Sequence, residues 1–478
     1  MSTSVTFALI ASYFLFLIGI SFLTGKNASN AAFFSANKKS PWFLVAFGMI
    51  GASLSGVTFI SVPGWVENSS FSYMQVVLGY ILGYLVIGTI LLPLYYRMNL
   101  TSIYGYLESR FGYYSYKTGA SFFIISRLIG ASFRLFLVAN VFQLFLFDAL
   151  GIEFWQTVTI TIILIWLYTF KSGIKTIIWT DSLQTLFMLI ALGVTITQVS
   201  NELNLSLSSL TSFIGNSSYS KIFYFFDFSS SNFFWKQFLS GAFIAIVMTG
   251  LDQDMMQKNL TCKSLKDAQK NMFWFTIVLT VVNFIFLILG LLLTEYAQSN
   301  GLDIHKDNLF PILAKDYLGP SVFIFFLLGL IAAAYSSADS ALTSLTTSFS
   351  IDIIDLEKKY DKLKQEKIRK RIHVLMSLVL ILIIISFKYL IRNESVIERL
   401  FVFAGYTYGP LLGYYSFGLF TKYKIRDNIS PLVALIAPIL SYLISVFCKT
   451  QFAFEFGFFI LVLNGALMFL GLLAIRKK

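Results

Sequence analysis

The segment AAAYSSADSALTS, residues 332–344, places a carboxylate and several hydroxyls inside a long apolar stretch. Five of its polar residues recur at positions i, i+3, i+4, i+7 and i+11, which lie on one face of a helix. They are Ser336, Asp339, Ser340, Thr343 and Thr347. A single serine in such a helix can bond to its own backbone, and small residues can serve close packing. A whole polar face with a carboxylate instead favours binding of a hard cation or a polar solute.

A second candidate is the stretch FGMIGASLSGVTFISVPG, residues 47–64, which combines glycines, hydroxyl residues and a proline. This composition predicts a discontinuous helix. A break frees backbone carbonyls, and these can ligate a cation where they line a cavity. A kinked and tightly packed helix without a ligand is the alternative.

Three further charges fall inside apolar segments. Arg127 and Arg134 are seven residues apart, on one helix face, and lie too deep to reach the membrane surface. We expect at least one of them to bind a solute carboxylate, which a guanidinium matches bidentately; an ion pair with Asp181 or another carboxylate is the alternative. Asp181 could be a solvated aspartate at the interface, or it could meet Asp339, since both are expected in the cytoplasmic half.

The composition indicates that membrane-spanning helices position these residues. The chain has 478 residues, of which 57% are hydrophobic and 13% charged, and its mean hydropathy is +0.75. Apolar runs of about 20 residues recur, and each is long enough to cross a bilayer as a helix. We therefore expect an all-α integral membrane protein in the lipid bilayer, with about thirteen spans. They are residues 5–24, 41–63, 71–98, 117–148, 153–171, 177–199, 235–252, 269–298, 317–352, 371–391, 395–421, 429–448 and 454–475.

The basic residues alternate between loops, and this predicts the orientation. With the N-terminus outside, the inside loops hold most of the Lys and Arg, including Lys258, the run 358–371 and the final Arg-Lys-Lys. This follows the positive-inside rule and places the C-terminus in the cytoplasm. It also accounts for the net charge of +12 without nucleic acid. The expected location is the cell (inner) membrane.

Few residues could support catalysis or a tightly held metal. Cys262 and Cys448 are expected on opposite sides of the membrane, and His305 and His373 are isolated in or beside loops. No zinc spacing or nucleophile–base pair is visible, so we expect no enzyme and no organic cofactor. A channel would need a continuous polar pore, whereas the polar clusters are confined to mid-membrane.

Three motifs together resemble the sodium:solute symporter family. They are GIKTIIWTD (173–181), GLDQDMMQKNLTCKSLKDAQK (250–270) and AAAYSSADS (332–340), and the similarity extends to GLFTKY (418–423). The resemblance implies a leucine-transporter-like core of two inverted five-helix repeats within a single transporter domain, 1–478. The repeats would be 41–199 and 235–421, preceded by an extra helix, 5–24, and followed by two helices, 429–475. A monomer is expected.

The resemblance also implies ligands for Na+ as the coupling ion. Carried over by motif, the main sodium site would use the carbonyls of Gly51, Leu54 and Ala333 and the hydroxyls of Ser336 and Ser337. Some relatives have a second sodium site. Its residues here would be Asp181, Ser336, Asp339 and Ser340, although a hydroxyl is usual where Asp339 stands.

The solute class follows from the same comparison of motifs. Ser53, Ser55 and Thr58 match the hydroxyl pattern of the sialic acid type, and Arg127 falls near its carboxylate-binding arginine. Gln75 and Arg134 are further candidate contacts.

Departures from the other family members narrow the solute. Ser53 replaces the aspartate of the proline carriers, and Ser172 replaces a usual glycine. Ala245, Met248 and Phe401 stand where the sugar carriers have aromatic and amide side chains. The resemblance thus implies a sodium-coupled symporter that imports a small organic anion, a sialic acid or smaller carboxylate, by alternating access. A neutral solute, an inorganic anion such as iodide, or a sensor that has lost transport are the alternatives.

Overall fold

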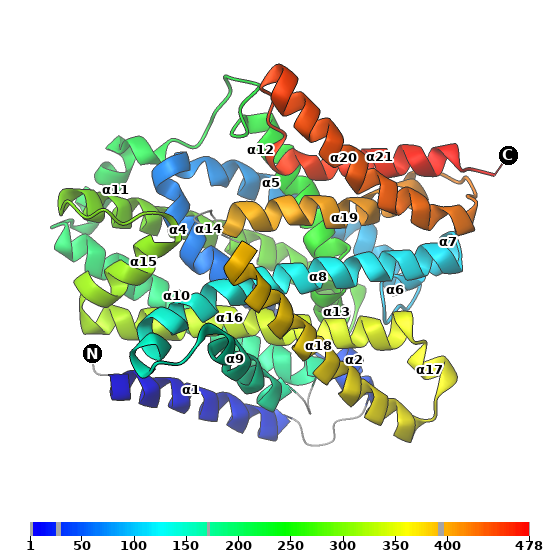
Figure 1. Ribbon diagram of the computed structural model, residues 1–478, viewed down its shortest axis with the longest axis horizontal. Helices are drawn as coiled ribbons and strands as arrows, with labels where there is room; N and C mark the ends of the chain where they lie inside the picture. The colour runs from blue at the N-terminus through cyan, green and yellow to red at the C-terminus, as the bar shows by residue number, and fades with distance from the viewer. Residues whose placement is uncertain (1–2, 25–29, 170–172, 391–395, 478) are drawn as a thin grey trace.

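The computed structural model describes residues 3–24, 30–169, 173–390 and 396–477, and its regular secondary structure is helical. Within these ranges the only β-type pairings are two isolated bridges, Ser40 with Cys262 and Ile425 with Arg476. Many of the long helices run along the longest axis of the molecule, and the two ends of the chain lie at opposite ends of that axis (Figure 1). The expected all-α class is confirmed.

The described part of the chain up to residue 202 forms ten α-helices. They are α1 (Thr3–Thr24), α2 (Asn30–Ser35), α3 (Trp42–Ser53), α4 (Gly56–Ser69), α5 (Tyr73–Val86), α6 (Leu92–Arg97), α7 (Gly105–Arg110), α8 (Tyr113–Phe142), α9 (Phe154–Thr169) and α10 (Gly173–Glu202).

The described residues beyond 202 form eleven more. They are α11 (Leu207–Asn216), α12 (Phe234–Ala245), α13 (Gln253–Asn259), α14 (Leu265–Ser299), α15 (Leu309–Ile312), α16 (Gly319–Ser348), α17 (Leu356–Lys359), α18 (Lys362–Leu390), α19 (Val396–Phe420), α20 (Ser430–Phe452) and α21 (Ile460–Ala474). Single π-helical turns extend several of them, including η7 (Ile246–Gly250) after α12 and η10 (Phe349–Ile353) after α16.

Each of the expected spans contains helix, but a count of thirteen crossings is not confirmed. Among the described residues, eight helices are long and apolar enough to cross a membrane, or nine if the bent pair Phe234–Gly250 and Gln253–Asn259 is one span. Three shorter apolar helices, Phe7–Leu23, Trp42–Ser53 and Phe154–Leu167, fall below that length. Breaks and bends account for part of the difference, since α3 ends inside an expected span and Gly56–Arg97 joins parts of two.

The predicted discontinuous helix is present as α3 and α4. Leu54 (φ −79°, ψ 75°) and Ser55 (φ −78°, ψ 176°) leave the helical conformation between them. A second break follows η7, where the chain bends by 68° before α13. Asp252 caps the new helix, because its Oδ1 accepts from the backbone N–H groups of Asp254 (2.9 Å) and Met255 (3.3 Å). Both breaks fall in the first helix of a predicted repeat.

The helix α16 lies inside the bundle. Every residue from Gly329 to Ser348 is buried, and α16 packs against α10, α8 and α3. Its polar face therefore contacts protein, as buried polar groups in a membrane protein must.

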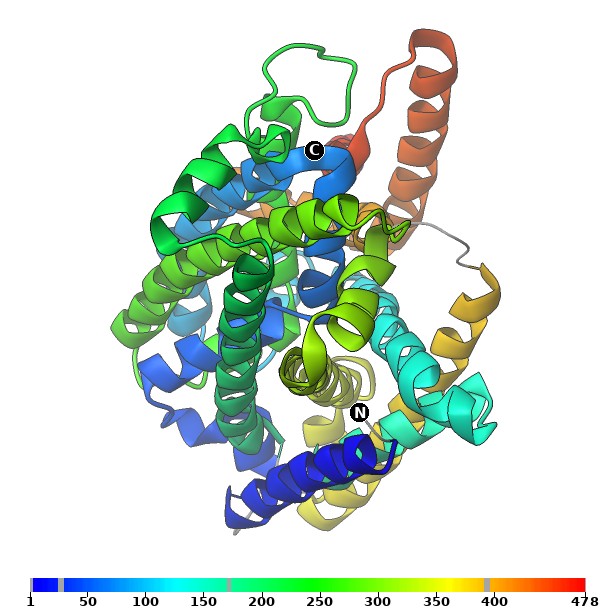
Figure 2. The ribbon, with the colours of Figure 1, turned by 90° about the vertical axis from the view of Figure 1, so that its left-hand side faces the viewer.

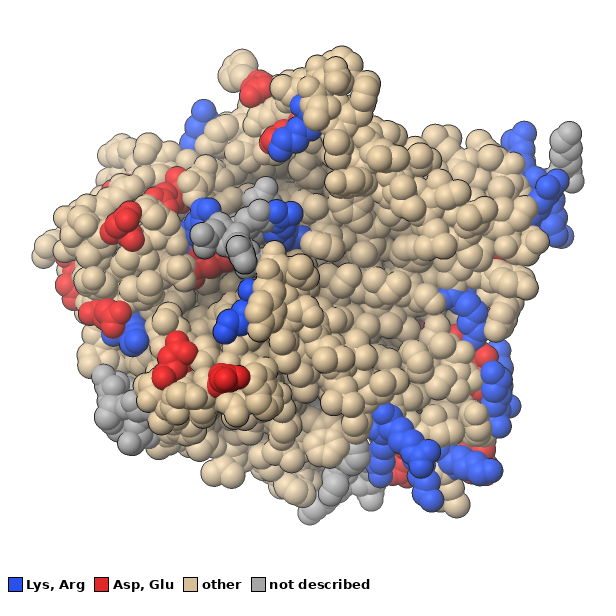
Figure 3. All heavy atoms as spheres, in the orientation of Figure 1, with Lys and Arg blue, Asp and Glu red and all other residues tan. Residues whose placement is uncertain are grey.

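Charged side chains are divided between the two ends of the molecule. On the face shown in Figure 3, acidic residues gather at the end that carries α11 and α15, and Lys and Arg gather at the end that carries α7, α17 and the C-terminus. Seen from the acidic end, the long connection between α11 and α12 stands out at the top of Figure 2. This division matches the charge alternation on which the predicted orientation rests.

The helix α4, which follows the break, is held by close helix packing, and this can be tested. A Cβ atom at Gly290 of α14 would lie 2.6 Å from the Pro63 carbonyl oxygen and 2.6 Å from Val66 Cγ2, both on α4. We expect Gly290→Val to destabilise the protein by about 1–3 kcal/mol, because the two helices must separate. The measurement is the unfolding temperature in detergent.

Gly193→Val is the matched control for this prediction. Gly193 is also helical, but nothing lies within 4 Å of a Cβ placed there. Equal unfolding temperatures for the two variants would contradict the close approach of α14 to α4.

Candidate functional site

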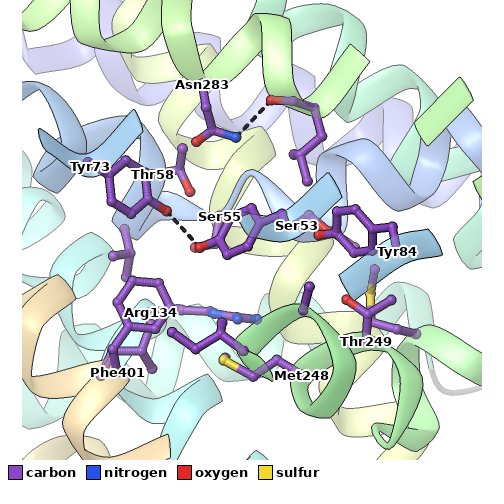
Figure 4. A pocket seen from close by; sticks show the side chains of 18 of the residues that line it. Ser53, Ser55, Thr58, Tyr73, Tyr84, Arg134, Met248, Thr249, Asn283 and Phe401 are labelled. Atoms are coloured by element: carbon purple, nitrogen blue, oxygen red, sulfur yellow. Dashed lines mark hydrogen bonds between the residues drawn. The ribbon is translucent and has the colours of Figure 1, made fainter. Parts of the chain in front are cut away.

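A cavity of about 80 Å³ lies beside the break between α3 and α4 (Figure 4). It is lined by that break together with α5, α8, α12 with η7, α13, α14 and α19. Its polar lining residues are Ser53, Ser55, Thr58, Tyr73, Tyr80, Tyr84, Arg127, Arg134, Thr249 and Asn283. Ala245, Met248 and Phe401 also line it. Ser172 lies outside the described residues.

Five of the six predicted solute contacts line this cavity: Ser53, Ser55, Thr58, Arg127 and Arg134.

Gln75 is not among the residues that line this cavity. Its side chain is fully buried and donates to the Asn232 carbonyl (3.0 Å) and to Gln237 Oε1 (3.2 Å), while its own Oε1 accepts from the Tyr224 N–H (3.1 Å). The face of α5 that carries Gln75 therefore ties this helix to α12 and the connection before it.

Three tyrosines of α5 line the cavity, although the sequence motifs did not identify them as candidate site residues. Tyr73, Tyr80 and Tyr84 stand at i, i+7 and i+11, which is one helix face. The hydroxyls of Tyr73 and Tyr80 are 3.1 Å apart. The spacing itself was the available signal.

The two arginines of α8 have different surroundings. Arg127 forms an ion pair with Asp254 of α13, and its Nη1 lies 3.9 Å from Asp252 Oδ2. Tyr408 donates to that same Asp252 oxygen at 2.5 Å. The predicted alternative of an ion pair for one arginine is thus realised, but the partner comes from the second helix break and is not Asp181.

Arg134 has no such partner. Its side chain is 8% exposed, and it makes no hydrogen bond or ion pair with any residue that the structure describes. The guanidinium extends into the cavity, below Ser53 and Ser55 in Figure 4. Asp252 and Asp254 act on Arg134 only without direct contact. A buried guanidinium that no carboxylate contacts is costly, so this cavity is electrostatically suited to an anion.

The residues predicted for the main sodium site lie on two facing elements. Ser337 of α16 donates to the Ala52 carbonyl at the break (3.5 Å). A Cβ atom at Gly51 would lie 3.4 Å from Ser336 Oγ and 3.1 Å from the Asp181 carbonyl oxygen. Leu54 and Ala333 are both buried.

Two buried oxygens in this region are unsatisfied. Asp181 Oδ1 and Ser336 Oγ have no hydrogen-bond partner among the described residues. Unsatisfied buried oxygens beside freed carbonyls fit a small hard cation.

The residues predicted for a second sodium site also meet. Ser340 Oγ donates to Asp181 Oδ2 (3.4 Å), and Asp339 Oδ1 accepts from the Ser340 N–H (2.5 Å). However, Lys258 Nζ lies 2.7 Å from that same Asp181 oxygen. Assigning Lys258 to a cytoplasmic loop was wrong, because its side chain is 1% exposed. Its position in the GLDQDMMQKN motif, four residues after Asp254, was the signal that could have placed it in the core.

Comparisons with known proteins support the resemblance found in the sequence. The family model "Sodium:solute symporter family" matches residues 33–424. The sodium-coupled monocarboxylate transporter 1 of Mus musculus is 24% identical over 438 residues, which are 88% of this chain and 69% of that protein. The sodium/sialic acid symporter NanT of Aliivibrio fischeri (strain ATCC 700601 / ES114) is 24% identical over 456 residues, 91% of this chain and 85% of that protein.

A solved structure shares the fold. It is the substrate-bound outward-open state of a Na+-coupled sialic acid symporter, with a TM-score of 0.83 at 17% identity over 99% of this chain and 98% of that one. The family match covers most of the chain, including the α3–α4 break, the arginines of α8 and the polar face of α16. The chain therefore belongs to the sodium:solute symporter family.

Proposed function

We propose that this chain is a sodium-coupled symporter for small organic carboxylates. The observation that carries this proposal is Arg134, a buried guanidinium that extends into the cavity without an ion-pair partner among the described residues. Hydroxyls of Ser53, Ser55 and Thr58 line the same cavity and can bond the remaining oxygens of a solute.

The cavity can hold a short carboxylate. A cavity holds one water molecule when it offers about 10–15 Å³. About 80 Å³ therefore holds several non-hydrogen atoms, comparable to a short-chain monocarboxylate. Sodium-coupled transporters of monocarboxylates and of sialic acid are both among the chain's relatives.

The shared break explains how sodium and solute are coupled. Sodium would bind between the carbonyls of Gly51 and Leu54 and the hydroxyls of Ser336 and Ser337. It would thereby hold α3 and α4 against α16. The same break presents Ser53 and Ser55 to the solute cavity, so an ion that orders the break also completes the solute site. Binding of each ligand then favours the other by the same factor.

A wide cavity of about 910 Å³ could serve as the outer vestibule. It lies between the end of α4, α8 and the residues around α15. Its lining holds four acidic residues, Glu67, Asp148, Asp303 and Asp307, against two lysines, Lys306 and Lys388. Acidic residues there would concentrate cations near the entrance.

In this proposal the N-terminus and this vestibule face outward, and the C-terminus is cytoplasmic in the cell inner membrane. The two helix breaks would be equivalent positions of inverted repeats, 41–199 and 235–421. Alternating access would tilt the first helices of these repeats about the central cavity. The transporter would work as a monomer.

The proposal is tested by uptake into proteoliposomes. A panel of short monocarboxylates, sialic acid, iodide and a neutral sugar is offered with and without an inward sodium gradient. We expect accumulation of a short monocarboxylate that requires sodium. Uptake without sodium, or uptake of the sugar alone, would contradict it.

Arg134 is predicted to bind the carboxylate. Arg134→Ala should weaken solute binding by about 2–5 kcal/mol, which is about 30-fold or more, because a buried charge pair is lost. Arg134→Lys should recover part of this, since it keeps the charge but not the bidentate geometry. The measurement is the solute concentration for half-maximal uptake, with sodium affinity determined separately without solute.

Arg426→Ala is the control for removing an arginine that does not line the cavity, since Arg426 is exposed. If Arg134→Ala transports normally while a folded Arg127→Ala does not, the solute arginine is Arg127.

Ser337 is predicted to be a sodium ligand. Ser337→Ala should raise the sodium concentration needed for half-maximal thermal stabilisation by about tenfold or more, because a hydroxyl bond to a charged group contributes about 1.5–3 kcal/mol. Ser344→Ala is the matched control, since the Ser344 hydroxyl only donates to the Ala341 carbonyl of its own helix (3.0 Å). Identical sodium dependence in both variants would exclude Ser337 from the site.

A further inference from the structure

A lysine lies among the residues predicted for a second sodium ion. Lys258 Nζ is 2.7 Å from Asp181 Oδ2, and the two side chains are 1% and 0% exposed. Lys258 comes from α13, the short helix that begins at the second break and is capped by Asp252. Its ammonium pairs with a carboxylate of α10, a helix that α13 contacts directly.

The ammonium uses the oxygen that a second sodium ion would need. Ser340 Oγ, another predicted ligand, lies 3.4 Å from the same Asp181 oxygen. An ammonium carries the same charge as a sodium ion, and it donates to the same carboxylate and hydroxyl oxygens. Two cations on one carboxylate oxygen would repel each other strongly in a buried setting. The residues present therefore do not fit a second sodium ion.

The charge balance of the cluster supports the same conclusion. Asp181, Asp254 and Asp339 all interact electrostatically with Lys258. Asp254 is balanced by its ion pair with Arg127, which leaves Asp181 and Asp339 in the cluster. Two carboxylates and one ammonium carry one net negative charge when all are ionised. A single sodium ion at the main site, beside the unsatisfied Asp181 Oδ1 and Ser336 Oγ, neutralises it. A second sodium would leave a net positive charge buried, which is costly.

We propose that Lys258 acts as a tethered cation in place of the second sodium ion, so that each transport cycle uses one sodium. The proposal rests on the sodium-coupled carboxylate transport proposed above. One sodium and one monocarboxylate carry no net charge. Their transport would therefore move no net charge across the membrane.

The consequence is a limit on accumulation. With one sodium, a tenfold sodium gradient supports about tenfold accumulation of a monocarboxylate, and the membrane potential adds nothing. With two, the same gradient gives about a hundredfold. One net charge crossing 100 mV adds about another fiftyfold.

The wild-type protein provides the first test and needs no variant. Uptake of the transported monocarboxylate is measured in proteoliposomes with a fixed sodium gradient, with and without a potassium diffusion potential of about 100 mV, inside negative. We expect the same plateau in both. A plateau raised about fiftyfold by the potential would overturn the proposal.

Equilibrium binding of radioactive sodium to the purified protein is a second readout that does not depend on transport. We expect one sodium per chain in the wild type. In Lys258→Gln the Asp181 oxygen becomes available, and we expect a second, weaker sodium to bind. Two sodium ions on the wild type, or still only one on a folded Lys258→Gln, would contradict the tethered cation.

Two further variants act as controls. Lys258→Arg keeps a cation beside Asp181 and should still bind one sodium. Lys236→Gln removes another buried lysine, whose Nζ contacts backbone carbonyls such as that of Glu455 (2.9 Å), and should leave the count at one. A second sodium in either variant would overturn the proposal.

The two proposals fail in different ways. Uptake that does not require sodium would contradict sodium-coupled transport itself. Uptake that requires sodium but gains a large factor from the potential would contradict only the role of Lys258.

Discussion

The break between α3 and α4 is the constraint on which the rest of the structure depends. Inside a membrane, backbone polar groups that leave a helix must be satisfied by protein or must line a cavity. At Leu54 and Ser55 the freed groups lie between the polar face of α16 and the solute cavity. One local interruption thus contributes to both binding regions. The burial of α16 follows from this, because its hydroxyls need partners that lipid cannot supply.

The second break positions the buried charges. It produces α13, whose Asp254 and Lys258 stand four residues apart. Asp254 pairs with Arg127 of α8, and Lys258 pairs with Asp181 of α10. This seven-residue helix therefore connects the wall of the solute cavity to the cation cluster. Because Arg127 and Tyr408 occupy the nearby carboxylates, Arg134 is left to face the cavity.

Much of this architecture was predictable from local sequence. Long apolar runs identify helices because a bilayer requires segments of about 20 residues. The glycines and hydroxyls of residues 47–64 predicted the break, and the spacing of Ser336, Asp339 and Ser340 predicted a buried polar face. The number of crossings was less predictable, because breaks, bends and short helices change length without changing composition.

The sequence by itself determined the helical class, the family motifs and which side chains share a helix face. Only the tertiary structure decided the partners. It directed Gln75 to α12 and away from the cavity, joined Arg127 to Asp254, and brought Lys258 into the core. The physical reason is that periodicity along a helix specifies the direction of a side chain relative to its neighbours. Which distant helix lies in that direction depends on how all the helices pack, and buried charges pair across those contacts.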